Sequence, residues 1–258
     1  MQNIKNILIT GASSGIGRAL AISYSNAGIN LFLCARNEEK LLNTKRLCEE
    51  LKAKVYIKIL DVTNYQDCFE WINEITKNYQ IDLVIANAGI SAGTAGGVES
   101  FQQIKQIFDT NLYGVLNIID PIINHMKDKK SGQIAIISSL AGFRGLPSSP
   151  AYSASKSAVR VYGEGLRGNL AEFGIKVNVI CPGYIKTPMT AVNNFYMPFI
   201  MEAEEAVKII KNKLSKNKSR ISFPFLLYFI IWFLTAISTT ITDPIFARLP
   251  KKKSLNDS

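Results

Sequence analysis

Short apolar runs alternate along this chain with longer stretches in which apolar residues recur every three or four positions. The short runs are rich in β-branched residues, as in buried strands. They predict strands at Ile4–Thr10, Ile29–Ala35, Lys54–Leu60, Ile81–Ala86, Gly132–Ser138, Ile175–Ile180 and Arg220–Phe223. The longer stretches predict helices at Arg18–Ala27, Glu38–Leu51, Tyr65–Asn78, Thr110–Met126 and Tyr152–Phe173. Strands that are apolar on both faces and alternate with helices predict an α/β fold, with a parallel sheet covered by helices on both sides.

Length and composition are those of one globular domain. The chain has 258 residues, enough for a single large α/β domain with a full core. Its four cysteines, Cys34, Cys48, Cys68 and Cys181, show no metal-binding spacing and are expected to be reduced and mostly buried. No metal site is predicted. The N-terminus runs directly into an apolar strand instead of a signal peptide, so we expect a cytoplasmic protein.

The formal net charge of +10 suggests nucleic acid or an anionic membrane surface as a partner. Much of the charge is local, in the segments 208–220 and 251–253. Neither segment has interleaved stacking aromatics or the pattern of a known nucleic-acid module, so no nucleic-acid partner is predicted. The only histidine, His125, lies near a predicted helix end beside Lys127 and is interpreted as a surface residue.

A glycine-rich turn follows the first strand and opens the first helix. Its residues are Gly11, Ser13, Ser14, Gly15, Ile16 and Gly17, with the spacing G-x-x-x-G-x-G. Glycines let a backbone approach a phosphate closely, and a helix N-terminus offers free N–H groups to the anion. The turn therefore predicts a dinucleotide phosphate site, with a purely structural turn as the alternative. After the second strand stands Arg36, which either pairs with a ribose 2′-phosphate, favouring NADP over NAD, or is an ordinary surface residue.

Tyr152 and Lys156 lie four residues apart at the start of a predicted helix. This spacing puts both side chains on one face, with roughly 5–6 Å between their Cβ atoms. An ammonium this close stabilises a phenolate and lowers the pKa of the phenol, which makes the tyrosine a usable proton donor and acceptor. The pair alone is weakly specific, because two such residues on an exposed face are usually just solvated.

Further residues stand in order around this pair. Ser139 precedes Tyr152 by thirteen positions, Asn111 lies in the helical region before it, and Asn87-Ala88-Gly89 closes the fourth strand. Asp61 follows the third strand and Pro182-Gly183 the sixth. With the glycine turn, this set resembles the short-chain dehydrogenase/reductase family over residues 4 to about 190. The resemblance implies a Rossmann-type, doubly wound sheet of about seven strands that binds NAD(P)(H). Arg36 favours NADP(H), with NAD(H) as the alternative.

The resemblance also implies a role for each matching residue. Tyr152 would be the general acid or base, Lys156 would lower its pKa and hold the nicotinamide ribose, Ser139 would bind the substrate oxygen, and Asn111 would anchor a relay water. Cofactor contacts are implied for the glycine turn and for Arg36, Asp61, Val62, Asn87, Ala88, Gly89, Tyr152, Lys156, Pro182, Gly183, Ile185 and Thr187. The implied reaction interconverts a small hydrophobic carbonyl and its alcohol. A catalytically silent dinucleotide sensor is the alternative from another class, although the intact Ser139, Tyr152 and Lys156 set speaks against it.

We divide the chain into a catalytic domain, 1–223, and an apolar and basic extension, 224–258. Within the domain, the family resemblance makes 188–217 the substrate lid, and its aromatic and methionine side chains suggest a hydrophobic substrate or a lid that packs on itself. The extension is predicted to form an apolar helix. Its basic flanks favour a helix lying on the cytoplasmic face of a membrane, with burial in an oligomer or beside the substrate pocket, or a true membrane span, as alternatives. The resemblance further implies a homodimer or tetramer.

Overall fold

The computed structural model describes residues 4–248, 250 and 252–254. Its strands form one sheet in the order β3-β2-β1-β4-β5-β6-β7, and every neighbouring pair is parallel. The strands are β1 Asn6–Thr10, β2 Asn30–Ala35, β3 Lys54–Ile59, β4 Leu83–Ala86, β5 Gly132–Ile137, β6 Ile175–Pro182 and β7 Arg220–Phe223. The predicted Rossmann-type sheet is confirmed.

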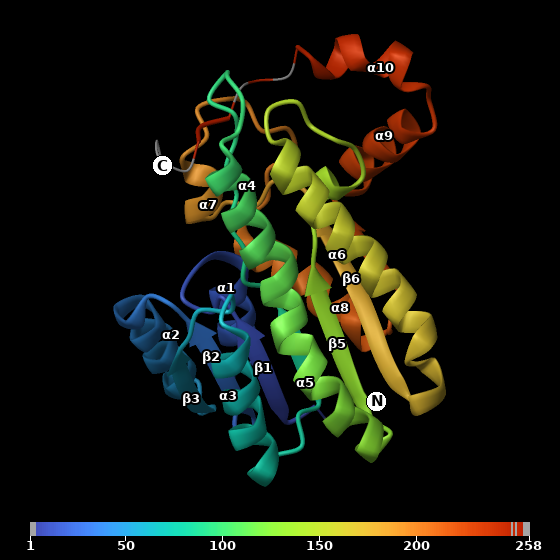
Figure 1. Cartoon of the computed structure of the whole chain (residues 1–258). Coiled ribbons are helices and arrows are strands. Elements are labelled where there is room, and N and C mark those ends of the chain that lie inside the picture. The colour runs from blue at the N-terminus through green and yellow to red at the C-terminus, as the bar shows by residue number, and fades with distance from the viewer. Residues whose placement is uncertain (1–3, 249, 251, 255–258) are drawn as a thin grey trace.

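Helices cover both faces of the sheet (Figure 1). They are α1 Gly15–Tyr24, α2 Glu38–Glu50, α3 Tyr65–Asn78, α4 Phe101–Phe108, α5 Gly114–Lys129, α6 Pro150–Asn169, α7 Pro188–Ala191, α8 Ala203–Ser215, α9 Phe225–Thr235 and α10 Thr239–Phe246. A π-helical turn, Asp109–Tyr113, joins α4 to α5, and short 3₁₀ turns lie at Leu140–Gly142 and Ala171–Phe173.

The two largest clusters of the core lie one on each face of the sheet. Ile7 and Ile9 of β1 face α1, α2 and α8, whereas Leu8 between them faces α3, α5 and α6. Because successive strand residues point to opposite faces, a strand buried on both sides must be apolar throughout. This requirement is the physical origin of the unbroken apolar runs in the sequence. The four cysteines are free and buried, as predicted.

The strand order reverses between β1 and β4, which are neighbours in the sheet but far apart in the chain. Loops that leave the carboxyl ends of these strands run to opposite sides, so a crevice opens between them. Figure 1 shows α7, α9 and α10 lying beyond this edge of the sheet. The fold therefore places a ligand site at the carboxyl edge, under these three helices.

The segment 188–217, predicted as a substrate lid, divides into two parts. Its first part holds the short helix α7 and an irregular loop. Its second part is α8, whose buried residues Ala206, Val207, Ile210 and Leu214 belong to the core against the sheet. These four positions follow helical spacing, and α8 lies against α1. The part that can cover a ligand is therefore shorter than the predicted segment.

The single apolar helix predicted after residue 224 is instead two helices, α9 and α10. The break falls at Ala236–Ser238, just before two threonines. Serine and β-branched threonine favour helix ends over helix interiors, which explains the interruption. Among the described residues, no helix has both the length and the apolar character needed to cross a bilayer.

Candidate active site

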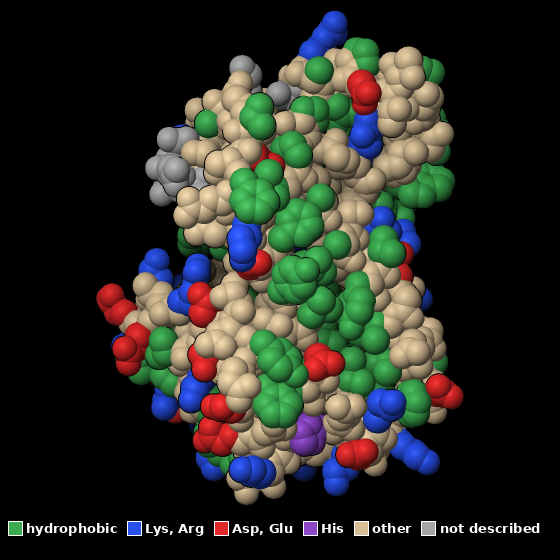
Figure 2. Space-filling view, viewed as in Figure 1, with side chains coloured by type: hydrophobic (Ala, Val, Ile, Leu, Met, Phe, Trp, Pro, Cys, Tyr) green, Lys and Arg blue, Asp and Glu red, His purple; other side chains and the backbone are tan. Residues whose placement is uncertain are grey.

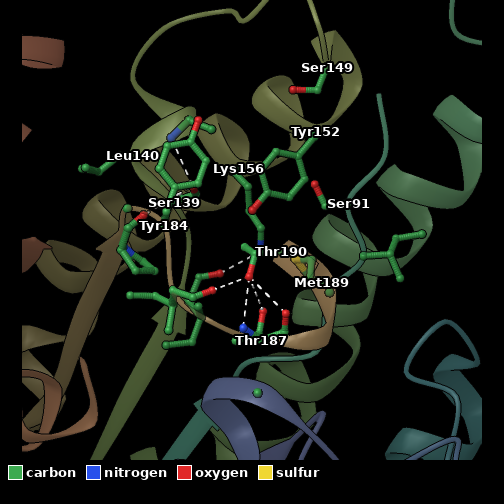
Figure 3. A pocket seen from close by; sticks show the side chains of 18 of the residues that line it. Ser91, Ser139, Leu140, Ser149, Tyr152, Lys156, Tyr184, Thr187, Met189 and Thr190 are labelled. Atoms are coloured by element: carbon green, nitrogen blue, oxygen red, sulfur yellow. Dashed lines mark hydrogen bonds between the residues drawn. The ribbon is translucent and has the colours of Figure 1, made fainter. Parts of the chain in front are cut away.

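A cavity of about 670 Å³ opens at the carboxyl edge of the sheet. The predicted site residues that line it come from the loops at the ends of six strands and, for Tyr152 and Lys156, from the first turns of α6. Figure 3 shows several of them facing the cavity. Asn111 and Gly17 are the two that do not line it. Gly17 packs behind Gly11, and Asn111 packs behind Gly89, and both of these glycines line the cavity. Positions separated by more than 170 residues in the sequence thus surround one space.

The glycine turn has the backbone conformation that its sequence predicts. Gly11 and Gly15 have φ angles of +65° and +53°, in the left-handed region that favours glycine. A Cβ atom at Gly17 would overlap the carbonyl oxygen of Gly11, so this position requires a glycine. The Asn87 side chain holds the turn in place by donating from Nδ2 to the carbonyl oxygen of Thr10 at 2.9 Å.

The turn forms a cradle that fits a dinucleotide phosphate. Gly11, Gly15 and the two serines between them line the cavity at the start of α1, where backbone N–H groups are free of helical partners. A larger side chain at Gly11 would collide with the backbone of Ala88 at 2.9 Å. The residues present therefore suit a pyrophosphate, and the cavity continues from this turn to Tyr152.

Arg36 and Asp61 lie side by side at the rim of the same cavity. Arg36 Nη1 is 3.7 Å from Asp61 Oδ2, and the Arg36 side chain is 65% exposed. An ion pair this exposed contributes little to stability, so neither side chain is fixed by the other. The arginine is therefore free to turn towards an anion at the end of β2.

Tyr152, Lys156 and Ser139 meet at the other end of the cavity (Figure 3). Pro150 starts α6, which places Tyr152 in the first turn of the helix, near the positive end of its dipole. Lys156 is 4% exposed, and its Nζ donates to the carbonyl oxygen of Ile137 at 3.0 Å. The Lys156 Nζ lies 5.9 Å from the centre of the Tyr152 ring.

The electrostatics differ from the expectation that Lys156 lowers the pKa of Tyr152. Burial raises the pKa of Tyr152, and only the hydrogen bond with Ser139 opposes this shift. Burial also lowers the pKa of Lys156 to about 8. The physical reason is that Lys156 is turned towards the Ile137 carbonyl, so desolvation outweighs the attraction between ammonium and phenolate.

Asn111 lies behind the site, in the π-helical turn that precedes α5. Its Oδ1 accepts from the Ile90 N–H at 2.8 Å, and its Nδ2 donates to the Ile90 carbonyl and to Ser155 Oγ. Gly89 makes this approach possible, because a Cβ there would lie 3.1 Å from Asn111 Oδ1 and 3.3 Å from Lys156 Nζ. Asn111 thus ties the loop after β4 to α6.

Ile185 and Thr187 line the cavity after β6, and a residue that the sequence did not suggest organises them. Thr190 Oγ1 donates to the Ile185 carbonyl at 2.6 Å and accepts from the Thr187 N–H at 3.0 Å (Figure 3). This is a capping box at the start of α7. The Thr187-Pro188-x-Thr190 pattern is the sequence signal that could have identified it.

The extension supplies part of the cavity wall. Leu227, Ile230 and Leu234 of α9, with Phe246 of α10, line the cavity. Arg144 holds α10 in place through Asp243 and lies over the Phe246 ring, 5.0 Å from its centre. The helices α9 and α10 are thus part of the cavity wall. Sequence reasoning missed Ser91, Tyr184 and Lys252, which also line the cavity, because nothing local marks them.

The comparisons with known proteins agree with this geometry. A family model described as short chain dehydrogenase matches residues 5–195. The chain belongs to this family. As a short-chain dehydrogenase it is an oxidoreductase, and the match runs from β1 to the loop after α7, which includes six of the seven strands. The extension from α9 onwards lies outside the matched part.

Individual relatives of this short-chain dehydrogenase extend the match. It is 35% identical over 225 residues to an uncharacterized oxidoreductase of Myxococcus xanthus, covering 87% of this chain and 89% of that one. It is 36% identical over 186 residues to a 3-oxoacyl-[acyl-carrier-protein] reductase of Rickettsia prowazekii, covering 72% and 75%. Among solved structures, ElxO with NADP bound superposes with a TM-score of 0.74 at 25% identity, covering 84% of this chain and 96% of that one.

Proposed function

We propose that this short-chain dehydrogenase interconverts a hydrophobic carbonyl compound and its alcohol with NADP(H), using Tyr152 as the general acid and base. The observation that carries the proposal is the shared cavity, which has a phosphate cradle at one end and Tyr152, Ser139 and Lys156 at the other. A dinucleotide extended between the two ends would bring its nicotinamide next to the tyrosine. Hydride transfer is the chemistry that a bound nicotinamide supplies.

The protein's own part in the reaction is positioning and proton transfer. Ser139 Oγ and the Tyr152 hydroxyl would both donate to the substrate carbonyl oxygen, fixing it for attack and stabilising the charge that develops there. Tyr152 then gives its proton to that oxygen. Because burial raises the pKa of Tyr152, the phenol is held in its protonated form, which suits reduction. If Lys156 turned from the Ile137 carbonyl towards a cofactor ribose, its positive charge would lie closer to the Tyr152 hydroxyl and would lower the pKa of that phenol.

NADP(H) is proposed over NAD(H) because of Arg36. This arginine stands at the end of β2, where it can meet a ribose 2′-phosphate, and the adjacent Asn37 is neutral. The bound NADP of the related ElxO supports the same choice. A dinucleotide sensor without chemistry remains the second candidate. Such a sensor would need the glycine turn that binds the phosphates. It would not need Ser139 and Tyr152 side by side next to an apolar pocket.

A substrate screen tests the proposed function. Purified protein would be assayed with long-chain ketones, aldehydes and alcohols, each with NADPH or NADP⁺ and with NADH or NAD⁺, following absorbance of the reduced cofactor. We expect turnover of apolar substrates that favours NADPH, and weaker turnover of short polar ones. Tight NADPH binding with no turnover of any carbonyl in the series would support the sensor instead.

We also propose that α9 touches a membrane surface from the cytoplasmic side. Its outward residues Phe225, Phe229 and Phe233 follow helical spacing, and Phe225 is 73% exposed. The opposite side of α9 packs on Leu140 and Cys181, so the helix is anchored while its aromatic side stays free. A helix that is held on one side and apolar on its exposed side can place that exposed side between headgroups and acyl chains.

Changing all three phenylalanines to serine should lower the fraction of protein that sediments with anionic phosphatidylglycerol vesicles by roughly tenfold or more, because their apolar area no longer enters the interface. The matched control changes three exposed aromatic residues away from α9 to serine: Phe101 of α4, Tyr113 of the π-helical turn and Tyr162 of α6. Figure 2 shows hydrophobic side chains gathered in a band over α4, α5 and α6. That band is the surface we expect to pair two copies of the chain. Equal sedimentation of both variants and the parent would contradict the membrane proposal.

A further inference from the structure

The last described residues of the chain run back across the substrate end of the cavity. The Ala95 N–H donates to the Lys252 carbonyl at 2.8 Å, and the Gly93 N–H donates to the Lys253 carbonyl at 2.6 Å. A Cβ atom at Gly93 would overlap Lys252, so this position admits the tail only because it is glycine. The tail is thus seated on the loop that follows β4.

This loop is itself held to the catalytic helix. Glu99 Oε2 accepts from the Ala151 N–H at 2.9 Å, and the Thr94 N–H donates to the Ser148 carbonyl at 3.0 Å. Ala95 has a φ of +49°, a left-handed conformation that a non-glycine residue keeps only where its surroundings hold it. The loop that carries the tail is therefore hydrogen-bonded to Ala151, the residue that precedes Tyr152 in α6.

The Lys252 side chain points into the cavity. Its Nζ donates to Ser91 Oγ and lies 5.2 Å from the centre of the Tyr152 ring. Burial lowers the pKa of Lys252 to about 8, so it is still mainly charged at neutral pH. Within the described part of the chain no carboxylate forms a salt bridge with it.

The two other cations that line this end of the cavity differ from Lys252 in their partners or their place. Arg144 pairs with the carboxylate of Asp243, and Lys156 donates to the Ile137 carbonyl on the side where the cofactor ribose is proposed to bind. A buried ammonium without an anion is costly, and an anion that reaches it is bound more strongly than in water. Among the described residues of this wall, Lys252 is therefore a cation without a carboxylate partner that a ligand can reach.

We propose that Lys252 binds a carboxylate of the substrate, so that the substrate is an amphiphilic oxo acid. Its carbonyl would lie at Ser139 and Tyr152, its carboxylate a few bonds away at Lys252 and Ser91, and its apolar chain against α9 and α10. Leu227, Ile230, Leu234 and Phe246 supply that apolar wall. The proposal rests on the proposed function, since it assigns the substrate class of the same site.

The test compares an acid with its own neutral ester. A γ-oxo dodecanoic acid and its methyl ester would be assayed with NADPH, and binding of dodecanoate to the NADP⁺-loaded protein would be measured by calorimetry. We expect the acid to be preferred by about ten- to one-hundredfold in kcat/KM, the range of one charge-assisted hydrogen bond. Lys252→Met should remove this preference and weaken dodecanoate binding by the same factor, whereas Lys252→Arg should keep both.

Lys253→Met is the matched control, since it removes the same charge from the exposed neighbouring side chain. It should leave the acid-to-ester ratio unchanged. An equal kcat/KM for acid and ester in the unmodified protein, or an acid preference that survives Lys252→Met, would overturn the carboxylate site. Turnover of the ester in the same assays reports on the oxidoreductase function separately, so the two failures can be told apart.

Discussion

Replacing Tyr152 with phenylalanine should lower kcat by between about 10² and 10⁴-fold, the usual contribution of a general acid or base. The substitution removes one hydroxyl and leaves the ring, so the packing of α6 and the neighbouring Ser139 are kept. The dissociation constant for NADPH should change by less than about threefold, because the phosphate cradle lies at the far end of the cavity. Stopped-flow single turnovers and fluorescence titration with NADPH would measure the two effects.

Tyr162→Phe is the matched control for this experiment. Tyr162 lies on the same helix but is exposed away from the cavity, and loss of its hydroxyl should leave kcat unaltered. If the Tyr152 variant kept most of its reductase activity, another group would have to protonate the substrate oxygen and the proposed mechanism would be wrong. Parallel loss of NADPH binding would instead show that Tyr152 is needed for the shape of the site.

Replacing Arg36 with serine should reduce the preference for NADPH over NADH by roughly 10- to 100-fold. The lost interaction is a charge-assisted pair with the 2′-phosphate, worth about 1.5–3 kcal/mol, and NADH has no phosphate to lose. The change should appear as a higher KM for NADPH with little effect on kcat. It should shrink at high salt, because Arg36 is mostly exposed to solvent.

Arg46→Ser serves as the control, since Arg46 is an exposed arginine of α2. The ratio of kcat/KM for NADPH and NADH should stay at its original value in that variant. An unchanged ratio in Arg36→Ser as well would show that the cofactor choice is made elsewhere. A preference for NADH in the unmodified protein would contradict the NADP(H) proposal outright.

The sheet and most of the cofactor residues could be predicted because their signals are local. Each strand is an apolar run, and residues at or just after its carboxyl end line the cavity, as Ala35 and Arg36 do at the end of β2. The parallel sheet brings the carboxyl ends of all its strands to one edge. The helix α4 was missed, although Phe101, Ile104, Ile107 and Phe108 have helical spacing. The amphipathic pattern of α8 was also hidden, because its many lysines were interpreted as a basic flank.

The substrate end of the site could not be predicted, because it is assembled from long-range contacts. Lys252 looks like one of three identical surface lysines, and only its contact with the loop at Gly93 places it beside Tyr152. The orientation of Lys156 was equally hidden. Helical spacing brings it near the tyrosine, but its hydrogen bond to Ile137 depends on where β5 ends.

The seating of residues 252–254 beside the substrate pocket also decides how the protein should be handled. A reporter inserted directly after residue 253 would lie beside the cavity, where it would pull Lys252 away from the loop at Gly93. The amino end of β1 lies at the opposite edge of the sheet (Figure 1). Insertions meant to leave the enzymology unchanged therefore belong in loops at the amino edge of the sheet.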